Sequence, residues 1–136
     1  MSFKFTNRPV VGFPIAVSVF DEKGKVVQIK FTAQYHRTSR SDLVDLRIAA
    51  HNVGRKEAGL DLLTNKDGVA CEWPYVDDEG LLLEKMCGWV GVTGDDNKPL
   101  PFSQEALVDL LSSYPELFES LVDGFHDAHR GAREKN

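Results

Sequence analysis

Apolar and polar residues alternate with a period of two along residues 13–35, and this is the clearest pattern in the chain. Nearly every second side chain is apolar in residues 13–19 and again in 27–35. Glu22-Lys23-Gly24 separates the two runs, and Gly24 can adopt the positive φ that a tight turn requires. The pattern predicts a β-hairpin. Because a lone hairpin is marginal in water, its apolar face is expected to lie on helices or to pair with strands of another copy.

After about residue 36 the apolar spacing becomes helical. It predicts helices near residues 41–57, 77–90, 103–112 and 115–130. Ser39 with Asp42 resembles a capping box at the first of these helices, and Ser103 is a good N-cap for the third. The predicted fold class is therefore α+β, with an N-terminal β-hairpin packed on a bundle of about four helices. A single domain over residues 1–136 is expected, with flexible ends at 1–10 and 131–136.

Residues 88–105 join the two helical halves. Asp95-Asp96-Asn97 follows Gly94, and short polar side chains of this kind bond their own backbone and tolerate left-handed geometry. Pro99 and Pro101 prevent a helix from passing through the segment. The segment is therefore predicted to be a compact loop that leads into the helix beginning near Ser103.

Composition excludes several classes of function. The 136 residues are 42% hydrophobic, which is enough for a core, and the formal net charge is -5, which argues against a nucleic-acid partner. No apolar run approaches the roughly 20 residues that cross a bilayer, so no membrane role is expected. The chain has 2 cysteines, too few for a disulfide framework, which favours a reducing cytoplasm.

Candidate chemical groups are few. His126 and His129 share a helix face, but a zinc site would need further ligands, and solvated histidines near a helix end are the simpler interpretation. Cys71 and Cys87 lack a neighbouring base. Residues 63–68 imitate a calcium loop, yet Pro74 stands where the bidentate Glu is required. No catalytic residue, metal ligand or cofactor is predicted, and the protein is not expected to be an enzyme.

The central segment and the closing helix together carry a family resemblance. Trp89-Val90-Gly91-Val92, the acidic turn, residues 100–107 and the basic end 131–136 resemble the tail assembly chaperones of long-tailed, siphovirus-type bacteriophages and prophages. The resemblance implies a non-enzymatic factor in the host cell cytoplasm. It also implies partners: such a factor binds the tape measure protein and promotes assembly of the tail tube protein. Self-association into a homo-oligomer is implied as well.

Two sets of contact residues are predicted. Leu107, Leu111, Phe118 and Val122 are the hypothesised residues for binding a partner's apolar helix. Gln28 and Ile29 are assigned to self-association through the hairpin edge, because an exposed strand offers unpaired amides and carbonyls to another copy. The alternatives are a minor structural protein of the virion tail and, less favoured, a small enzyme of unknown type.

Overall fold

The computed structural model describes residues 2–132 and divides into two compact units. Among the described residues, the first unit combines residues 2–37 with residues 77–132, and the second comprises residues 38–76. The organisation of the whole chain as a single domain stays a prediction. Part of the expected flexible ends, residues 1 and 133–136, lies outside the described residues.

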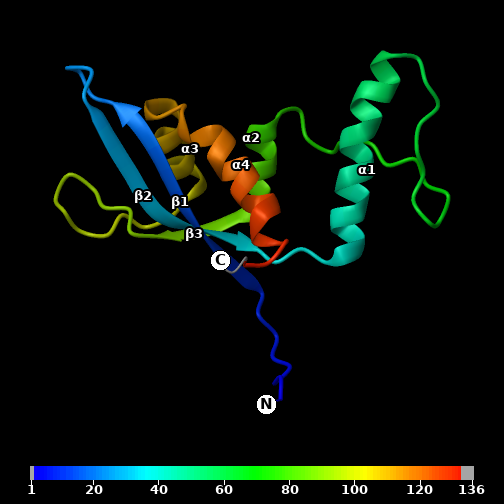
Figure 1. Cartoon of the computed structure of the whole chain (residues 1–136), viewed down its shortest axis with the longest axis horizontal. Helices are drawn as coiled ribbons and strands as arrows, with labels where there is room; N and C mark the ends of the chain where they lie inside the picture. The colour runs from blue at the N-terminus through cyan, green and yellow to red at the C-terminus, as the bar shows by residue number, and fades with distance from the viewer. Residues whose placement is uncertain (1, 133–136) are drawn as a thin grey trace, which may run out of the picture. The chain divides into compact units, whose positions relative to one another are not determined.

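A three-stranded antiparallel sheet with the order β1-β2-β3 forms the framework of the first unit (Figure 1). Strands β1 (Val10–Phe20) and β2 (Val26–His36) pair along their whole length. In the turn, the Asp21 carboxylate accepts the N–H groups of Lys23 and Lys25, both at 2.8 Å, and Gly24 adopts a φ of 78°. The predicted hairpin and its glycine turn are confirmed.

The third strand, β3 (Met86–Val90), lies where the sequence pattern predicted a helix. The helix expected over residues 77–90 exists only as α2 (Asp78–Lys85), and the residues that follow it pair with Thr32–Tyr35 of β2. Apolar residues keep their helical spacing past Lys85, but pairing with β2 satisfies the backbone of this segment, and Trp89 and Val90 favour strands. The prediction of helix across residues 86–90 is wrong.

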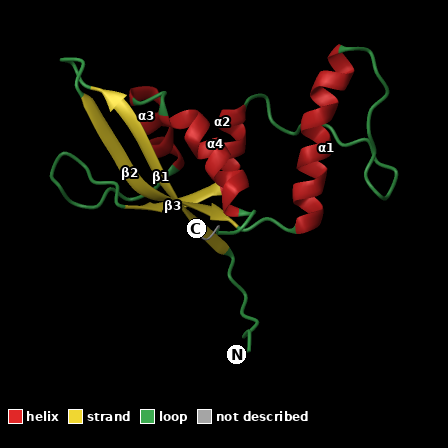
Figure 2. Cartoon of the chain, in the orientation of Figure 1, coloured by secondary structure: helices red, strands yellow, loops and turns green. Residues whose placement is uncertain are grey.

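The other predicted helices are confirmed as α1 (Arg40–Glu57), α3 (Gln104–Ser113) and α4 (Leu117–Ala128). The Ser103 hydroxyl caps α3 by accepting the N–H of Ala106 at 3.0 Å, as the sequence predicted. With one sheet and four helices in the part of the chain that the structure describes, the fold class is α+β (Figure 2). Helices α2, α3 and α4 belong to the first unit, whereas α1 belongs to the second.

The core of the first unit lies between the sheet and helix α4. Inward side chains of β1 and β2, such as Ile15 and Tyr35, are buried there. The Tyr35 hydroxyl donates a hydrogen bond of 2.6 Å to the backbone carbonyl of Leu121 in α4, and its ring meets Phe125 edge to face with centroids 5.8 Å apart. Burial raises the pKa of the Tyr35 hydroxyl well above its usual value, so this group stays a neutral donor.

The segment between β3 and α3 is held by Trp89. Its indole Nε1–H donates to the carbonyl of Leu100 at 2.7 Å, and its ring meets Phe102 edge to face at 5.0 Å. At the tip, the Asp96 carboxylate accepts the N–H of Lys98 at 3.0 Å, and Asn97 adopts a φ of 60°. The predicted compact loop is therefore confirmed, and Trp89 connects its two ends.

The second unit consists of α1 and the loop that follows it. The Ser39 hydroxyl caps α1 by accepting the N–H of Asp42 at 3.2 Å, as predicted. Asn52 is 3% exposed and joins the loop to the helix. Its Nδ2 donates to the carbonyls of Leu63 and Cys71, both at 2.9 Å, while its Oδ1 accepts the N–H of Leu63 at 2.8 Å. One side chain thus fixes the path of a loop that has little regular structure of its own.

Candidate interaction surfaces

The two edges of the hairpin differ in how well they are protected. The pairs at the ends of the β1–β2 ladder are hydrogen-bonded: the N–H of Asp21 donates to the Lys25 carbonyl, and that of Arg37 to the Pro9 carbonyl. In an antiparallel ladder, the residues between alternate between facing the partner strand and facing away. By this alternation the backbone of Pro14 faces outward on β1, so its lack of an N–H removes no hydrogen bond from the hairpin. The proline also hinders the pairing of another strand with this edge.

The opposite edge of β2 is open over half of its length. Strand β3 pairs with Thr32–Tyr35 only, so among the described residues no strand covers Val26–Phe31 on that side. The same alternation turns the backbone of Gln28 toward the open edge. Ile29 is opposite Val17, so its backbone faces β1. The two residues predicted for self-association therefore differ in position: the backbone of Gln28 faces the open edge, and that of Ile29 does not.

We predict that Gln28→Pro weakens self-association through this edge, because proline removes an N–H that a second strand would use. Ile29→Pro would instead remove a donor within the hairpin and unfold it. Lys30→Pro changes the next open-edge backbone and should act like Gln28→Pro, whereas Gln28→Thr keeps the N–H and serves as the control. Light scattering over a range of concentrations measures the effect. Equal association of Gln28→Pro and Gln28→Thr would contradict this use of the edge.

The four residues predicted to contact a partner helix separate into two pairs. Leu107 and Leu111 of α3 point into the core and are 0% and 8% exposed. Phe118 and Val122 lie one turn apart on α4 and are half-buried, beside the fully buried Leu117 and Leu121. Leu107 is therefore unavailable to a partner in this conformation. The partner-binding role of all four residues stays a prediction, and Phe118 and Val122 are the accessible ones.

A shallow groove, the helical groove, lies on the surface beside Phe118. It has a volume of about 400 Å³ and is lined by residues of α2, of α3, of the turn between α3 and α4, and of the start of α4: Glu79, Leu111, Ser112, Pro115 and Phe118. Its walls are mostly apolar, and Glu79 is the only charged lining residue. The groove is thus shaped for an apolar side chain or helix face rather than for a small polar substrate.

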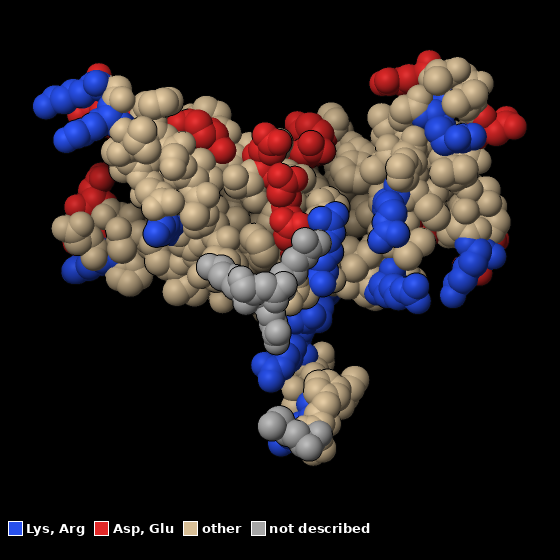
Figure 3. Space-filling model, in the orientation of Figure 1, with Lys and Arg blue, Asp and Glu red and all other residues tan. Residues whose placement is uncertain are grey.

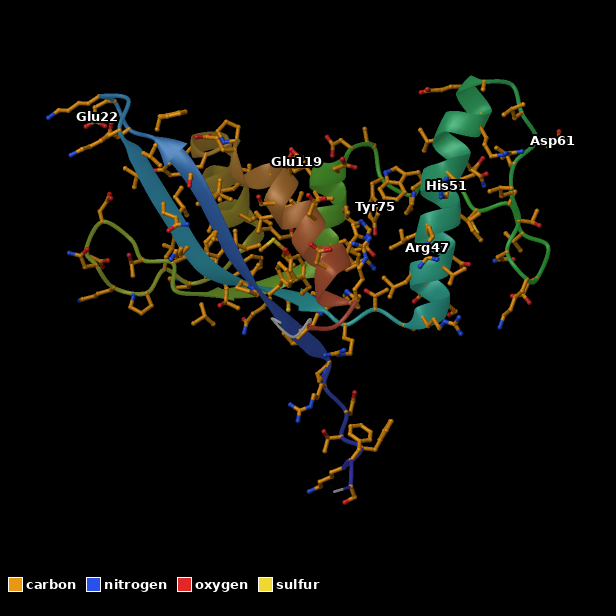
Figure 4. The ribbon with its side chains drawn as sticks, in the orientation of Figure 1. Glu22, Arg47, His51, Asp61, Tyr75 and Glu119 are labelled. Atoms are coloured by element: carbon orange, nitrogen blue, oxygen red, sulfur yellow. The ribbon has the colours of Figure 1, made fainter. Side chains whose placement is uncertain are left out.

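Acidic side chains gather on the helices that line the helical groove. Figure 3 shows Asp and Glu gathered over α4 and α2, and Glu119 is exposed on α4 (Figure 4). Residues 99–129, which include α3 and α4, contain six acidic residues and no Lys or Arg. This one-sided charge is visible in the sequence, although a search for catalytic motifs does not find it. It favours an apolar partner that also carries Lys or Arg.

The candidate chemical groups are the two free cysteines and the histidines of the α4 end. Burial raises the pKa of the Cys87 thiol, and burial together with Asp45 raises that of Cys71, so both thiols are less ionised than usual. Partial burial lowers the pKa of His126, and Arg130 lowers it further. Among residues 2–132, no group of three or more His, Cys, Asp or Glu side chains could hold a metal ion.

No helix within the described part of the chain is both long and apolar enough to span a membrane. A small α+β unit that combines an open strand edge with an apolar groove is typical of proteins that act by binding other proteins. Comparison with protein families agrees with this class: the model of a family described as phage tail assembly chaperone matches residues 1–136. The chain therefore belongs to the phage tail assembly chaperone family. Comparisons with curated proteins and with solved structures give no match.

Family membership confirms the resemblance seen around Trp89. Chaperones of this kind are in general non-enzymatic and bind protein partners. The sequence alone indicated this class from the central loop and the closing helix. It did not indicate which apolar residues face outward, because that depends on how α3 and α4 pack.

Proposed function

We propose that this chaperone binds apolar helices of the tape measure protein in the host cytoplasm and promotes assembly of the tail tube around it, without catalysis. The observation that carries the proposal is the family match over residues 1–136. The helical groove supports it, because Leu111, Pro115 and Phe118 offer an apolar contact next to a core that is already complete.

Binding at the helical groove is expected to be weak for each copy. Apolar burial contributes about 25 cal/mol per Å² removed from water, but ordering and desolvation offset much of it. A long helical partner offers many similar segments, so several chaperone copies acting together would hold it much more tightly than one. Self-association of the chaperone would raise this multivalency, and we propose the open edge of β2 as one contact between copies.

Co-expression with the tape measure protein of the same phage tests the proposal. We expect the partner to stay in solution and to co-purify with the chaperone. An insoluble partner from which no complex can be isolated would refute the proposal. Presence of the chain in purified virions, with no such complex, would favour the alternative of a minor structural protein.

Phe118→Ala is expected to weaken this complex by about tenfold or more, since an aromatic anchor in an interface contributes about 1–3 kcal/mol. Val108→Ala is the matched control, because Val108 is an exposed apolar residue of α3 that does not line the helical groove. Pull-down titrations give the two affinities, and thermal unfolding checks that both variants stay folded. Equal affinities of the two folded variants would exclude the groove as the binding surface.

A further inference from the structure

The segment before β1 exposes two large aromatic rings. Residues 2–9, the arm, have no regular secondary structure, and Phe3 and Phe5 are 85% and 86% exposed. Their rings meet edge to face at 6.4 Å. Apart from that contact, no hydrogen bond, ion pair or ring contact joins residues 2–7 to another described residue. Two exposed phenylalanines in contact form an apolar patch, and such patches on a protein surface are typical of interaction sites.

The arm is attached firmly at its other end. The backbone N–H of Arg37 donates to the Pro9 carbonyl at 2.8 Å, and the Arg37 Nε–H donates to the Arg8 carbonyl at 2.9 Å. These bonds hold Arg8 and Pro9 beside the end of β2. The direction in which the arm leaves the sheet is therefore set by the fold, and the backbone of the arm extends away from β1 (Figure 1).

The arm and the helical groove are both apolar, and they carry opposite charges. Within residues 1–20, Lys4 and Arg8 are the charged residues and no Asp or Glu occurs. The groove presents apolar walls with Glu79, and Glu116 and Glu119 immediately follow two of its lining residues in sequence. An apolar, basic segment thus matches an apolar, acidic groove on the same protein.

We propose that the arm of one copy binds the helical groove of a second copy, with Phe3 and Phe5 against the apolar wall and Lys4 facing Glu79. The proposal rests on the proposed function in one respect, namely that the helical groove is a binding surface. It adds that the groove has a ligand within the chaperone itself. An arm and a tape measure helix would then compete for the same groove.

Geometry favours a second copy over the arm's own groove. The C-terminal end of α4, at Ala128, lines a pocket together with Val11–Pro14 at the start of β1, so the arm begins near that end. The helical groove lies at the other end, beside Phe118. Phe118 lies about 15 Å before Ala128 along α4. Strand β1 runs back along α4, since Phe13 and Ile15 lie beside Gly124, so Pro9 lies about 7 Å further from the groove than Val11 does. The four residues from Pro9 back to Phe5 span at most about 14 Å. Phe5 therefore falls short of the groove in its own chain.

Because arm and groove lie at opposite ends of α4, the contact between copies is head to tail. A head-to-tail contact uses two different surfaces, so each bound copy still offers a free arm or a free groove, and association continues into a chain or a closed ring. Two phenylalanines bury about 300–500 Å². That is well below the roughly 1,200 Å² of a stable interface, so the association is weak and depends on protein concentration.

The first test removes the aromatic rings of the arm. We expect the Phe3→Ser, Phe5→Ser double variant to shift self-association, measured by sedimentation over a range of concentrations, at least about tenfold toward the monomer. Phe20→Ser is the matched control, since Phe20 is 75% exposed but lies at the end of β1, outside the arm. If the double variant associates as strongly as the wild type, or if Phe20→Ser reduces association equally, the arm proposal is overturned.

The second test exchanges charges. Lys4→Glu and Glu79→Lys are each expected to weaken self-association, and the two together in one chain are expected to restore it, because the opposite charges again face each other. Failure of the double variant to recover would overturn the pairing of arm and groove. Both positions lie outside the core, so circular dichroism should show an unchanged fold.

Measuring how well the variants bind the tape measure protein distinguishes a failure of the arm proposal from a failure of the proposed function. The arm variant keeps its groove, so one copy should bind a tape measure segment too short for two copies at least as well as the wild type does. Loss of self-association in a protein that never binds tape measure would refute the proposed function and support the arm. Normal tape measure binding by an arm variant whose self-association is unchanged would support the proposed function and refute the arm proposal.

Discussion

Gly124→Ala is expected to destabilise the first unit by about 2 kcal/mol, although alanine in a helix normally stabilises by about 1 kcal/mol relative to glycine. A Cβ at this position of α4 would lie 2.8 Å from the Tyr35 hydroxyl and 3.1 Å from Cδ1 of Ile15. The helix would have to move off β1, and overpacking of this kind costs about 1–3 kcal/mol. The move would also disturb the buried Tyr35–Leu121 hydrogen bond, which adds about 1 kcal/mol.

Gly54→Ala is the matched control, because Gly54 lies within α1 and a Cβ there would meet nothing within 4 Å. This variant should gain up to about 1 kcal/mol. Urea unfolding measures both free energies. The Tyr35→Phe substitution removes the atom nearest to the added Cβ, so Gly124→Ala should cost less in the Tyr35→Phe background. A Gly124→Ala protein that is more stable than the wild type would contradict the close packing of α4 on β1.

The sequence predicted the elements whose patterns are local. The hairpin alternates over two long runs around Gly24, and α1 and α3 begin at serine caps whose side chains accept the expected N–H groups. Strand β3 was missed because it is only five residues long and its apolar residues continue the spacing of α2. Its conformation depends on pairing with β2, which is about 50 residues distant in sequence. The local pattern of apolar and polar residues does not indicate that pairing.

The sequence indicates less about the contact surfaces than about the fold, for a physical reason. An apolar stripe shows that a helix has a buried side, but it does not show where burial stops. Leu111 and Phe118 both belong to such stripes, yet the first is 8% exposed and the second is half-buried beside the helical groove. Likewise, the alternation of the hairpin predicted which side chains share a face, whereas the backbone direction of Gln28 and Ile29 required the hydrogen-bonded pairs at its ends.

Asn52 shows the same limit for the second unit. A single asparagine in the middle of an amphipathic helix is a weak signal in a sequence, since asparagines in helices usually face water. Its importance depends on two loop residues, Leu63 and Cys71, that come 11 and 19 positions later. In the structure, three hydrogen bonds converge on this one side chain.

Asn52→Ala is therefore expected to release the loop of the second unit, with the largest effect of any single substitution outside the first unit's core. It leaves two carbonyls and the Leu63 N–H without the partners they have now. Each such group costs about 1–3 kcal/mol when buried, and less where water can reach it, so we expect a total of about 3 kcal/mol. Asn52→Asp has nearly the same shape but lacks both donors, so a similar loss there would assign the effect to hydrogen bonding rather than to packing.

Hydrogen exchange of the Leu63 amide reports directly on this loss. About 3 kcal/mol corresponds to exchange faster by roughly a hundredfold, since every 1.4 kcal/mol is a factor of ten. His51→Ala is the control, because His51 is the exposed neighbour of Asn52 on α1 (Figure 4) and should leave that amide protected. Amides of β1 and β2 should exchange as in the wild type, because those strands belong to the first unit. If the Leu63 amide stays equally protected in Asn52→Ala, the hydrogen bonds of Asn52 do not hold the loop. Packing of the loop on α1 would then be what stabilises it.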